Sequence, residues 1–155
     1  MPSAGPTAAP RELPQFAVFI DRNSGGRLFR LLIEQAGIEV HLHDEHFRQK
    51  TEDPEWLARV GKSGWLLVSG DNEVTRQPLF LHQLAESKAH VFVMLALNGA
   101  SPAGKAARIV SAYGKMCELA ADHAPPALWR IGKDGVARAF DFRSTLERMK
   151  RGRKI

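Results

Sequence analysis

The sequence predicts an α/β protein in which helices cover both faces of a central, mostly parallel sheet. Short apolar runs that suit strands buried on both faces alternate with segments whose apolar residues recur at helical spacing. The alternation occurs four times and is followed by a hairpin signal, a pattern that favours right-handed crossovers and three layers. With 155 residues and 44% hydrophobic composition, the chain is long enough for one domain with a buried core.

The first predicted strand is the apolar run 16–20, which ends at Asp21. Ser24 is placed to cap a following helix over residues 26–36. The apolar residues expected on the buried side of that helix are Leu28, Leu31, Leu32 and Ala36. Because ligands of open α/β sheets bind beyond the carboxyl ends of strands, Asp21 is a candidate site residue. The local alternative is that Asp21 only caps its loop.

Three more strand–helix units and a hairpin follow. Proline just inside a helix and glycine just past its end indicate where the predicted helices begin and end. The predicted strands are residues 38–42, 65–69 and 91–95. The predicted helices are residues 55–60, a segment opened by Pro78, and a long segment that runs from Ser101-Pro102 to Pro125-Pro126. Lys133-Asp134-Gly135, between residues 128–131 and 136–140, predicts a small C-terminal hairpin.

Composition and charge divide the chain into three parts. Residues 1–14 are rich in Pro, Ala and Ser and predict a disordered tail, and residues 15–142 form the predicted domain. The net charge is +5, and residues 143–155 alone carry six basic residues against Glu147, so the rest is neutral. This basic C-terminal tail can bind phosphate backbones or an acidic partner. The alternative is a solvated, partly helical end.

The sequence favours a cytoplasmic protein without a membrane partner. No apolar run approaches the roughly 20 residues that a membrane span needs. The N-terminus lacks the basic start and apolar core of a signal peptide. The single cysteine, Cys117, cannot form an internal disulfide and falls on the apolar side of a predicted helix, which suits a reducing compartment.

Carboxylates follow the predicted strands or begin the next helices. We therefore expect Asp21, Asp44, Glu45, Asp53 and Asp71 to converge at one edge of a parallel sheet, although they are far apart in sequence. Gathered carboxylates repel one another unless a cation neutralises them. Mg²⁺ and Mn²⁺ prefer such oxygen ligands, activate water and stabilise phosphoryl displacement. The pattern therefore suggests phosphodiester hydrolysis.

Five stretches, taken in order, resemble a known family. They are Phe19-Ile20-Asp21-Arg22-Asn23, Ala36-Gly37-Ile38-Glu39-Val40-His41, Asp53-x-Glu55-Trp56-Leu57, Gly64-Trp65-Leu66-Leu67-Val68-Ser69-Gly70-Asp71 and Val91-Phe92-Val93. Their order resembles the PIN-like nucleases, and most closely the compact VapC-type toxins of bacterial toxin–antitoxin pairs, over about residues 16–132. The resemblance implies a Rossmann-like three-layer fold and a metal-dependent endoribonuclease restrained by a cognate antitoxin. It also implies a homodimer, because family members commonly pair.

The resemblance also implies roles for particular residues. Asp21, Asp53 and Asp71 match the acids that bind Mg²⁺ or Mn²⁺ and carry catalysis, and Ser69 stands where the family usually has Thr. Further acids that can join the site are Asp44, Glu45, Glu55 and Glu73. Basic residues that can bind the RNA backbone are Arg22, Arg27, Lys50 and Arg76. A fourth acid beyond Asp71 has only Glu73 as a candidate, so the site holds a single metal or the copy is degenerate.

Each candidate also has a local structural interpretation. Asp53 before Pro54 suits an N-cap, Glu55 is favoured by the helix dipole, and Asp71 between Gly70 and Asn72 suits a turn. His41, His43 and His46 raise a zinc hypothesis, but their spacing matches no closed structural zinc set. They also suit a pocket rim or ordinary polar positions.

Two rival functions come from other classes. One is a degenerate PIN-like domain that only binds a protein or nucleic acid. The other is a phosphatase or receiver-like domain in which Asp21 accepts a phosphoryl group. The second lacks the neighbouring Asp of a phosphatase motif, since Arg22 and Asn23 follow Asp21.

Overall fold

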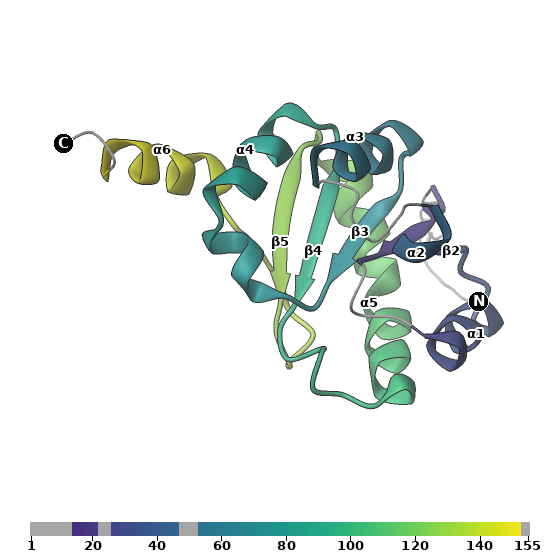
Figure 1. The fold of residues 1–155 in the computed structure, drawn as a ribbon. Helices are drawn as coiled ribbons and strands as arrows, with labels where there is room; N and C mark the ends of the chain where they lie inside the picture. The colour runs from purple at the N-terminus through teal and green to yellow at the C-terminus, as the bar shows by residue number, and fades with distance from the viewer. Residues whose placement is uncertain (1–13, 22–25, 47–52, 153–155) are drawn as a thin grey trace, which may run out of the picture.

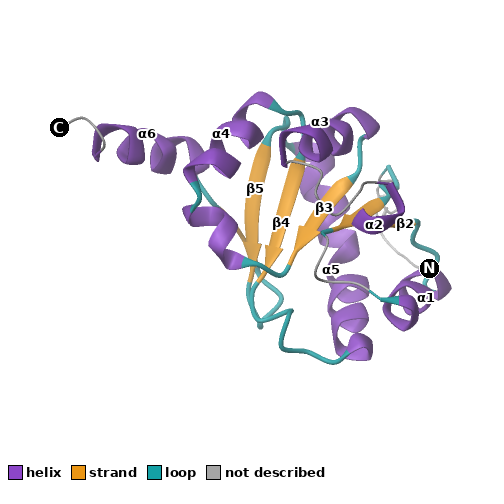
Figure 2. Ribbon diagram, in the orientation of Figure 1, coloured by secondary structure: helices purple, strands orange, loops and turns teal. Residues whose placement is uncertain are grey.

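A computed structural model describes residues 14–21, 26–46 and 53–152, without the side chains of residues 44, 45 and 53–55. A six-stranded sheet forms its centre, with helices on both sides (Figures 1 and 2). The strands are β1 (Val18–Ile20), β2 (Val40–Leu42), β3 (Leu66–Ser69), β4 (His90–Met94), β5 (Ala127–Ile131) and β6 (Ala137–Ala139). The helices are α1 (Arg27–Gln35), α2 (His43–His46), α3 (Asp53–Ser63), η1 (Asn72–Arg76), α4 (Pro78–Glu86), α5 (Pro102–Asp122) and α6 (Phe142–Gly152).

The sheet has the strand order β2-β1-β3-β4-β5-β6. β1 to β5 are parallel, and β6 is antiparallel to β5. The predicted α/β class with a mostly parallel sheet and a C-terminal hairpin is therefore confirmed. The chain moves outward from β1 to β2 and then returns to β3 on the other side of β1. In doubly wound sheets the reversal between β1 and β3 is the point where ligands bind.

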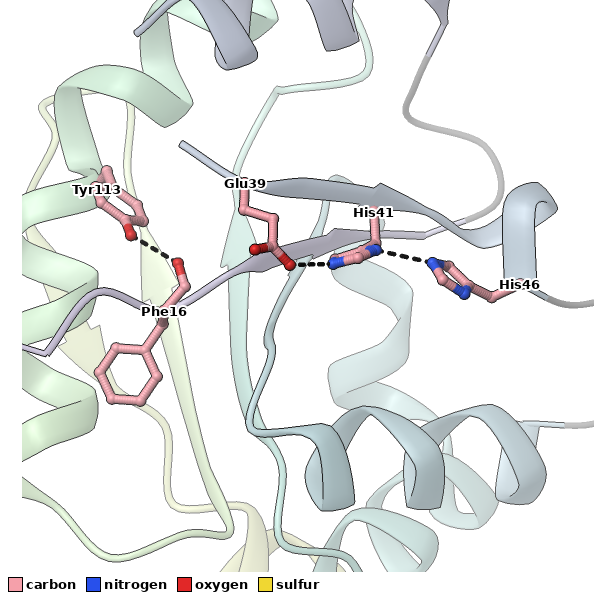
Figure 3. Close-up of polar contacts among 5 residues, drawn as sticks. All are labelled: Phe16, Glu39, His41, His46 and Tyr113. Atoms are coloured by element: carbon pink, nitrogen blue, oxygen red, sulfur yellow. Dashed lines mark hydrogen bonds and ion pairs between the residues drawn. The ribbon is translucent and has the colours of Figure 1, made fainter. Parts of the chain in front are cut away.

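The strands are buried on both faces, as their continuous apolar runs predict. Val18 and Ile20 point into a core that α1 and α5 cover, whereas Phe19 points into a second core covered by α3, α4 and the start of α6. The Tyr113 hydroxyl of α5 donates a 2.6 Å hydrogen bond to the Phe16 carbonyl, which fixes the chain entering β1 (Figure 3). Cys117 is buried in the first core, as its helical position predicts.

The connection through α5 has the opposite hand from the others. The β3–α4–β4 and β4–α5–β5 connections step the same way across the sheet, yet α4 and α5 cover opposite faces. The connections through α1 and α3 share the hand of the α4 connection. Right-handed crossovers throughout are therefore a wrong prediction. Since α1 alone cannot cover its face, α5 crosses to that side and buries Phe92 and Trp129.

The buried face of α1 differs from the sequence prediction. Phe29 and Ile33 are its buried residues, whereas Leu28 and Leu31 are about half exposed and Ala36 is exposed. The N-cap position of α1 is Gly26, and Ser24 lies outside the described residues. None of the helices in the described ranges combines the length and apolar character of a membrane span.

Candidate functional site

The hydroxyl of Ser69 joins the ends of β1 and β3. Ser69 is buried and donates a 2.5 Å hydrogen bond to Oδ2 of Asp21, and its Oγ accepts a 3.0 Å hydrogen bond from the Asp71 backbone N–H. The backbone N–H of Asp21 in turn donates to the Val68 carbonyl at 3.3 Å. Residues about 50 positions apart in sequence are thus brought together at the strand reversal. The Asp21 carboxylate and the backbone of Asp71 therefore lie at the same edge of the sheet.

Asp71 also caps the short helix η1. Its Oδ1 accepts a 2.9 Å hydrogen bond from the Glu73 backbone N–H, so the capping role inferred from the sequence is real. The other carboxylate oxygen of Asp71 does not take part in that bond. The next residue, Asn72, has a buried Oδ1 without a hydrogen-bond partner in the described part of the chain. The Asp71 carboxylate and the Asn72 amide oxygen, two hydrogen-bond acceptors on consecutive residues, therefore follow the carboxyl end of β3.

Glu73 and Arg76 occupy the exposed side of η1. Their side chains are 64% and 69% exposed, and Oε1 of Glu73 lies 3.6 Å from Nη1 of Arg76. An exposed pair of this kind contributes little to stability. Both side chains therefore remain available to a ligand at low cost. Arg27, the other described member of the predicted RNA-binding set, is exposed at the start of α1.

Arg130 of β5 anchors η1 to the sheet. Its Nη2 donates a 3.1 Å hydrogen bond to Oγ1 of the buried Thr75, and its guanidinium carbon lies 4.4 Å from the Phe140 ring centroid. The Thr75 hydroxyl also donates a 2.8 Å hydrogen bond to the Asn72 carbonyl, so Arg130 is linked through Thr75 to the first residue of η1. The position of the turn after Asp71 therefore depends on a strand that is two places away in the sheet.

The loop after β4 reaches the same edge. Because α5 lies on the far face, the chain must pass beyond the carboxyl ends of the strands on its way from β4. Ala96 has a φ of +61°, which is uncommon for a residue with a side chain. A Cβ atom at Gly70 would lie 2.8 Å from Cγ of Asn98, so the Asn98 amide packs against the backbone between Ser69 and Asp71.

Glu39, His41 and His46, in and beside β2 at the border of the sheet, form a chain of polar contacts (Figure 3). Oε2 of Glu39 lies 2.6 Å from Nε2 of His41, and Nδ1 of His41 lies 2.8 Å from Nε2 of His46. Burial lowers the pKa of His46, and the charges of His41, Arg59 and Arg30 lower that pKa further. His46 is therefore neutral near pH 7.

In the described part of the chain, His41, His43 and His46 form no metal site. Three ring nitrogens of His41 and His46 are already engaged with each other or with Glu39. His43 is buried edge-on to Phe19 and Trp56. Among the side chains that the structure describes, no group of three or more His, Cys, Asp and Glu lies close enough to hold a metal ion. The zinc hypothesis finds no support in this part of the molecule.

The remaining predicted site residues fall in two groups. Asp44 and Glu45 lie in α2, and Asp53 and Glu55 lie in the first turn of α3, both after β2. Their side chains are outside the described set. Arg22 and Lys50 lie outside the described residues altogether. The structure thus brings together Asp21 and Asp71, with Glu73 two residues further along.

The sheet order, the acidic strand reversal and the helices on both faces define a doubly wound α/β protein with a polar edge. The family model for the PIN-like domain matches residues 16–96, from the entry into β1 to the loop after β4. The chain belongs to the PIN-like domain family, whose members are commonly nucleases. It matches no curated protein and no solved structure.

Sequence reasoning missed Asn98 and Arg130 as parts of this edge. In the sequence, Asn98-Gly99 predicts a turn. The Asn98 side chain packs against Gly70 because the chain passes the carboxyl ends of the strands on its way to α5. Arg130 lies in the otherwise apolar strand segment Leu128–Ile131. Its charge was the one feature of the sequence that could have marked it as a structurally important residue. Such a residue in a strand facing a helix predicts a specific partner, although not which one.

Arg130 and Thr75 are predicted to be energetically coupled. Replacing Arg130→Leu and Thr75→Val singly and together should give a coupling free energy of about 1 kcal/mol in urea unfolding, because a buried hydrogen bond is lost. Arg138→Leu on the facing strand is the matched control, since Arg138 forms an exposed pair with Asp134. Arg138→Leu should change the free energy of unfolding by no more than about 0.5 kcal/mol. A coupling near zero would show that η1 is held by other contacts.

Proposed function

We propose that this protein is a metal-dependent endoribonuclease whose centre is the edge formed by Asp21, Ser69 and Asp71. The observation that carries the proposal is the Ser69 hydroxyl, which links the Asp21 carboxylate to the backbone of Asp71. Membership of the PIN-like family supports a nuclease of some kind. The choice of RNA as substrate comes from the resemblance to the VapC-type toxins.

The donor atoms of this edge fit Mg²⁺ or Mn²⁺. Both ions prefer oxygen ligands, keep several waters and need only one or two protein carboxylates. Asp21 and Asp71 would supply the carboxylates, and Asp53 is the third acid that the resemblance adds. The buried, unpartnered Oδ1 of Asn72 is a further oxygen acceptor beside Asp71. When bound, the ion supplies an activated water and charge stabilisation for phosphodiester cleavage.

The protein's own residues hold this arrangement ready. Ser69 orients the Asp21 carboxylate by its hydrogen bond, and Arg130 fixes the turn that begins at Asp71 through Thr75. Preorganised groups of this kind cost no rearrangement when substrate arrives. Arg27 and Arg76 are exposed near the starts of α1 and α4 and are proposed to bind the RNA backbone, together with Arg22 and Lys50.

The toxin role is a further step of the proposal. The order of motifs resembles compact toxins that a cognate antitoxin restrains, and such toxins commonly form homodimers. We therefore propose a cytoplasmic ribonuclease controlled by a small protein partner. The support is the motif order, joined by a PIN-like match that spans β1 to β4.

A degenerate PIN-like binding module is the second candidate. It is favoured by one observation: the sequence offers no acid beyond Asp71 at a clear spacing, and Glu73 is the sole candidate for a fourth acid. Such a module would bind RNA or a protein without cleaving it. Calorimetric titration with Mn²⁺ separates the two, because only the nuclease should show saturable binding that EDTA reverses.

Replacing Asp21→Asn should abolish Mn²⁺-dependent cleavage of structured RNA. We expect a loss of about 100-fold or more, since even residues that only orient metal ligands cost about 10–100-fold when removed. Cleavage products are resolved on denaturing gels with and without EDTA, and circular dichroism checks the fold. Glu118→Gln on the exposed side of α5 is the control. Wild-type cleavage by Asp21→Asn, or cleavage that survives EDTA, would refute this mechanism.

Expression in a bacterial host tests the toxin role. The wild-type protein should arrest growth and reduce intact cellular RNA, whereas Asp21→Asn should do neither at the same protein level. Growth and RNA integrity are followed after induction, with protein amounts compared by immunoblot. Cleavage in vitro without any growth effect would leave the nuclease in place and contradict the toxin role.

A further inference from the structure

Helix α6 is a well-formed helix that extends away from the sheet (Figure 1). Asp141 caps it: its Oδ1 accepts from the Ser144 backbone N–H at 3.0 Å, and its Oδ2 accepts from the Ser144 hydroxyl at 2.7 Å. The backbone hydrogen bond from Ser144 lowers the pKa of the Asp141 carboxyl. Phe142 and Leu146 are buried in the core covered by α4. The basic segment seen in the sequence is therefore a capped helix that packs on the core over its described length.

The opposite side of α6 is basic. Arg143, Arg148 and Arg151 line one shallow hollow of about 310 Å³ together with Ser144 and Glu147. We call these three arginines the α6 arginine face. All three are exposed. In the part of the chain that the structure describes, none of them forms an ion pair with a carboxylate.

Many cations of the body are already engaged. Arg130 donates to Thr75, and Arg108 donates to the carbonyls of Leu95 and Gly132. The exposed pairs are Arg30–Glu34, Arg76–Glu73, Lys115–Glu118 and Arg138–Asp134. A polyanion that approaches the carboxylates at the strand reversal meets repulsion unless cations attract it elsewhere. The α6 arginine face is a concentrated source of such attraction.

A groove of about 630 Å³ lies between the end of η1 and α6. Arg76, at the end of η1, and Lys150 of α6 line it together with Leu79, Leu146 and Met149. Because η1 begins next to Asp71, α6 and the turn that follows this carboxylate border the same groove.

We propose that the α6 arginine face binds the phosphate backbone of single-stranded RNA that flanks the cleavage site. The proposal rests on the proposed ribonuclease function for the identity of the polyanion. Arginine forks match phosphate oxygens, and backbone contacts of this kind need no apolar surface. An acidic protein partner would need apolar anchors among the cations, but the described residues that line the hollow of the α6 arginine face are all polar or charged. The observations therefore favour RNA.

The test measures the salt dependence of RNA binding by the full chain. A fluorescent, unstructured RNA of about 24 nucleotides is titrated in EDTA, so that no cleavage occurs. The variant Arg143→Gln/Arg148→Gln/Arg151→Gln is compared with Lys62→Gln/Lys88→Gln/Lys115→Gln. The control lowers the net charge equally, at sites away from α6. Circular dichroism checks both folds, and Arg148→Gln/Arg151→Gln provides a second variant that spares the first helical turn.

Each phosphate contact on a single strand contributes about 0.7 to the slope of log K against log salt concentration. Loss of three contacts should lower the slope by about 2, and loss of two by about 1.4. The affinity advantage of the wild type over the triple variant should then shrink about 20-fold between roughly 50 and 200 mM salt. The control should retain the wild-type slope within about 0.5.

Equal slopes for the α6 variant and the control would overturn the proposal. Binding of poly-glutamate through α6, with RNA binding unchanged by the same substitutions, would also overturn it and assign the face to an acidic protein. Because the titration contains no divalent ion, its result does not depend on catalysis. The protein could show the predicted change in slope for the α6 variant and yet never cleave RNA. That result would refute the proposed nuclease activity and leave RNA binding by α6 intact.

Discussion

The hydrogen bond from Ser69 to Asp21 is the contact on which the candidate site depends. It exists because β1 and β3 are neighbours, which requires the chain to leave β1 for β2 on one side and return on the other. The same hydroxyl accepts from the backbone of Asp71, so one small side chain sets the relative position of two acids. The buried hydroxyl donates one hydrogen bond and accepts one, so it is satisfied as a buried polar group.

The two layers of helices constrain this edge from both sides. On one face Arg130 and Thr75 hold η1 against the sheet, so Asp71 begins a turn with a defined course. On the other face α5 must reach the core that α1 leaves open, and the connecting loop brings Asn98 against Gly70. Covering the apolar sheet thus determines which polar groups surround the carboxylates. Stability of the core and geometry of the site have the same origin.

The sequence was sufficient for the features that local physics decides. The strands follow from continuous apolar runs, the helix starts from Pro78 and Pro102, and the shared edge of Asp21 and Asp71 from parallel topology. Features set by distant packing were not predictable. The hand of the α5 connection depends on which face lacks cover, and the exposure of Leu28 depends on where Phe29 packs. The partner of Arg130 lies 55 residues away, beyond the reach of any local pattern.

The central claim is that Asp21 and Asp71 form one ion site. Paramagnetic broadening by Mn²⁺ of the backbone amide signals of isotopically labelled protein tests it most directly, because the broadening depends steeply on distance from the ion. At low Mn²⁺, the account predicts selective loss of the signals of Asp21, Ser69, Gly70 and Asp71, and recovery when EDTA is added. Uniform weak broadening, or selective broadening elsewhere with these four signals intact, would contradict it.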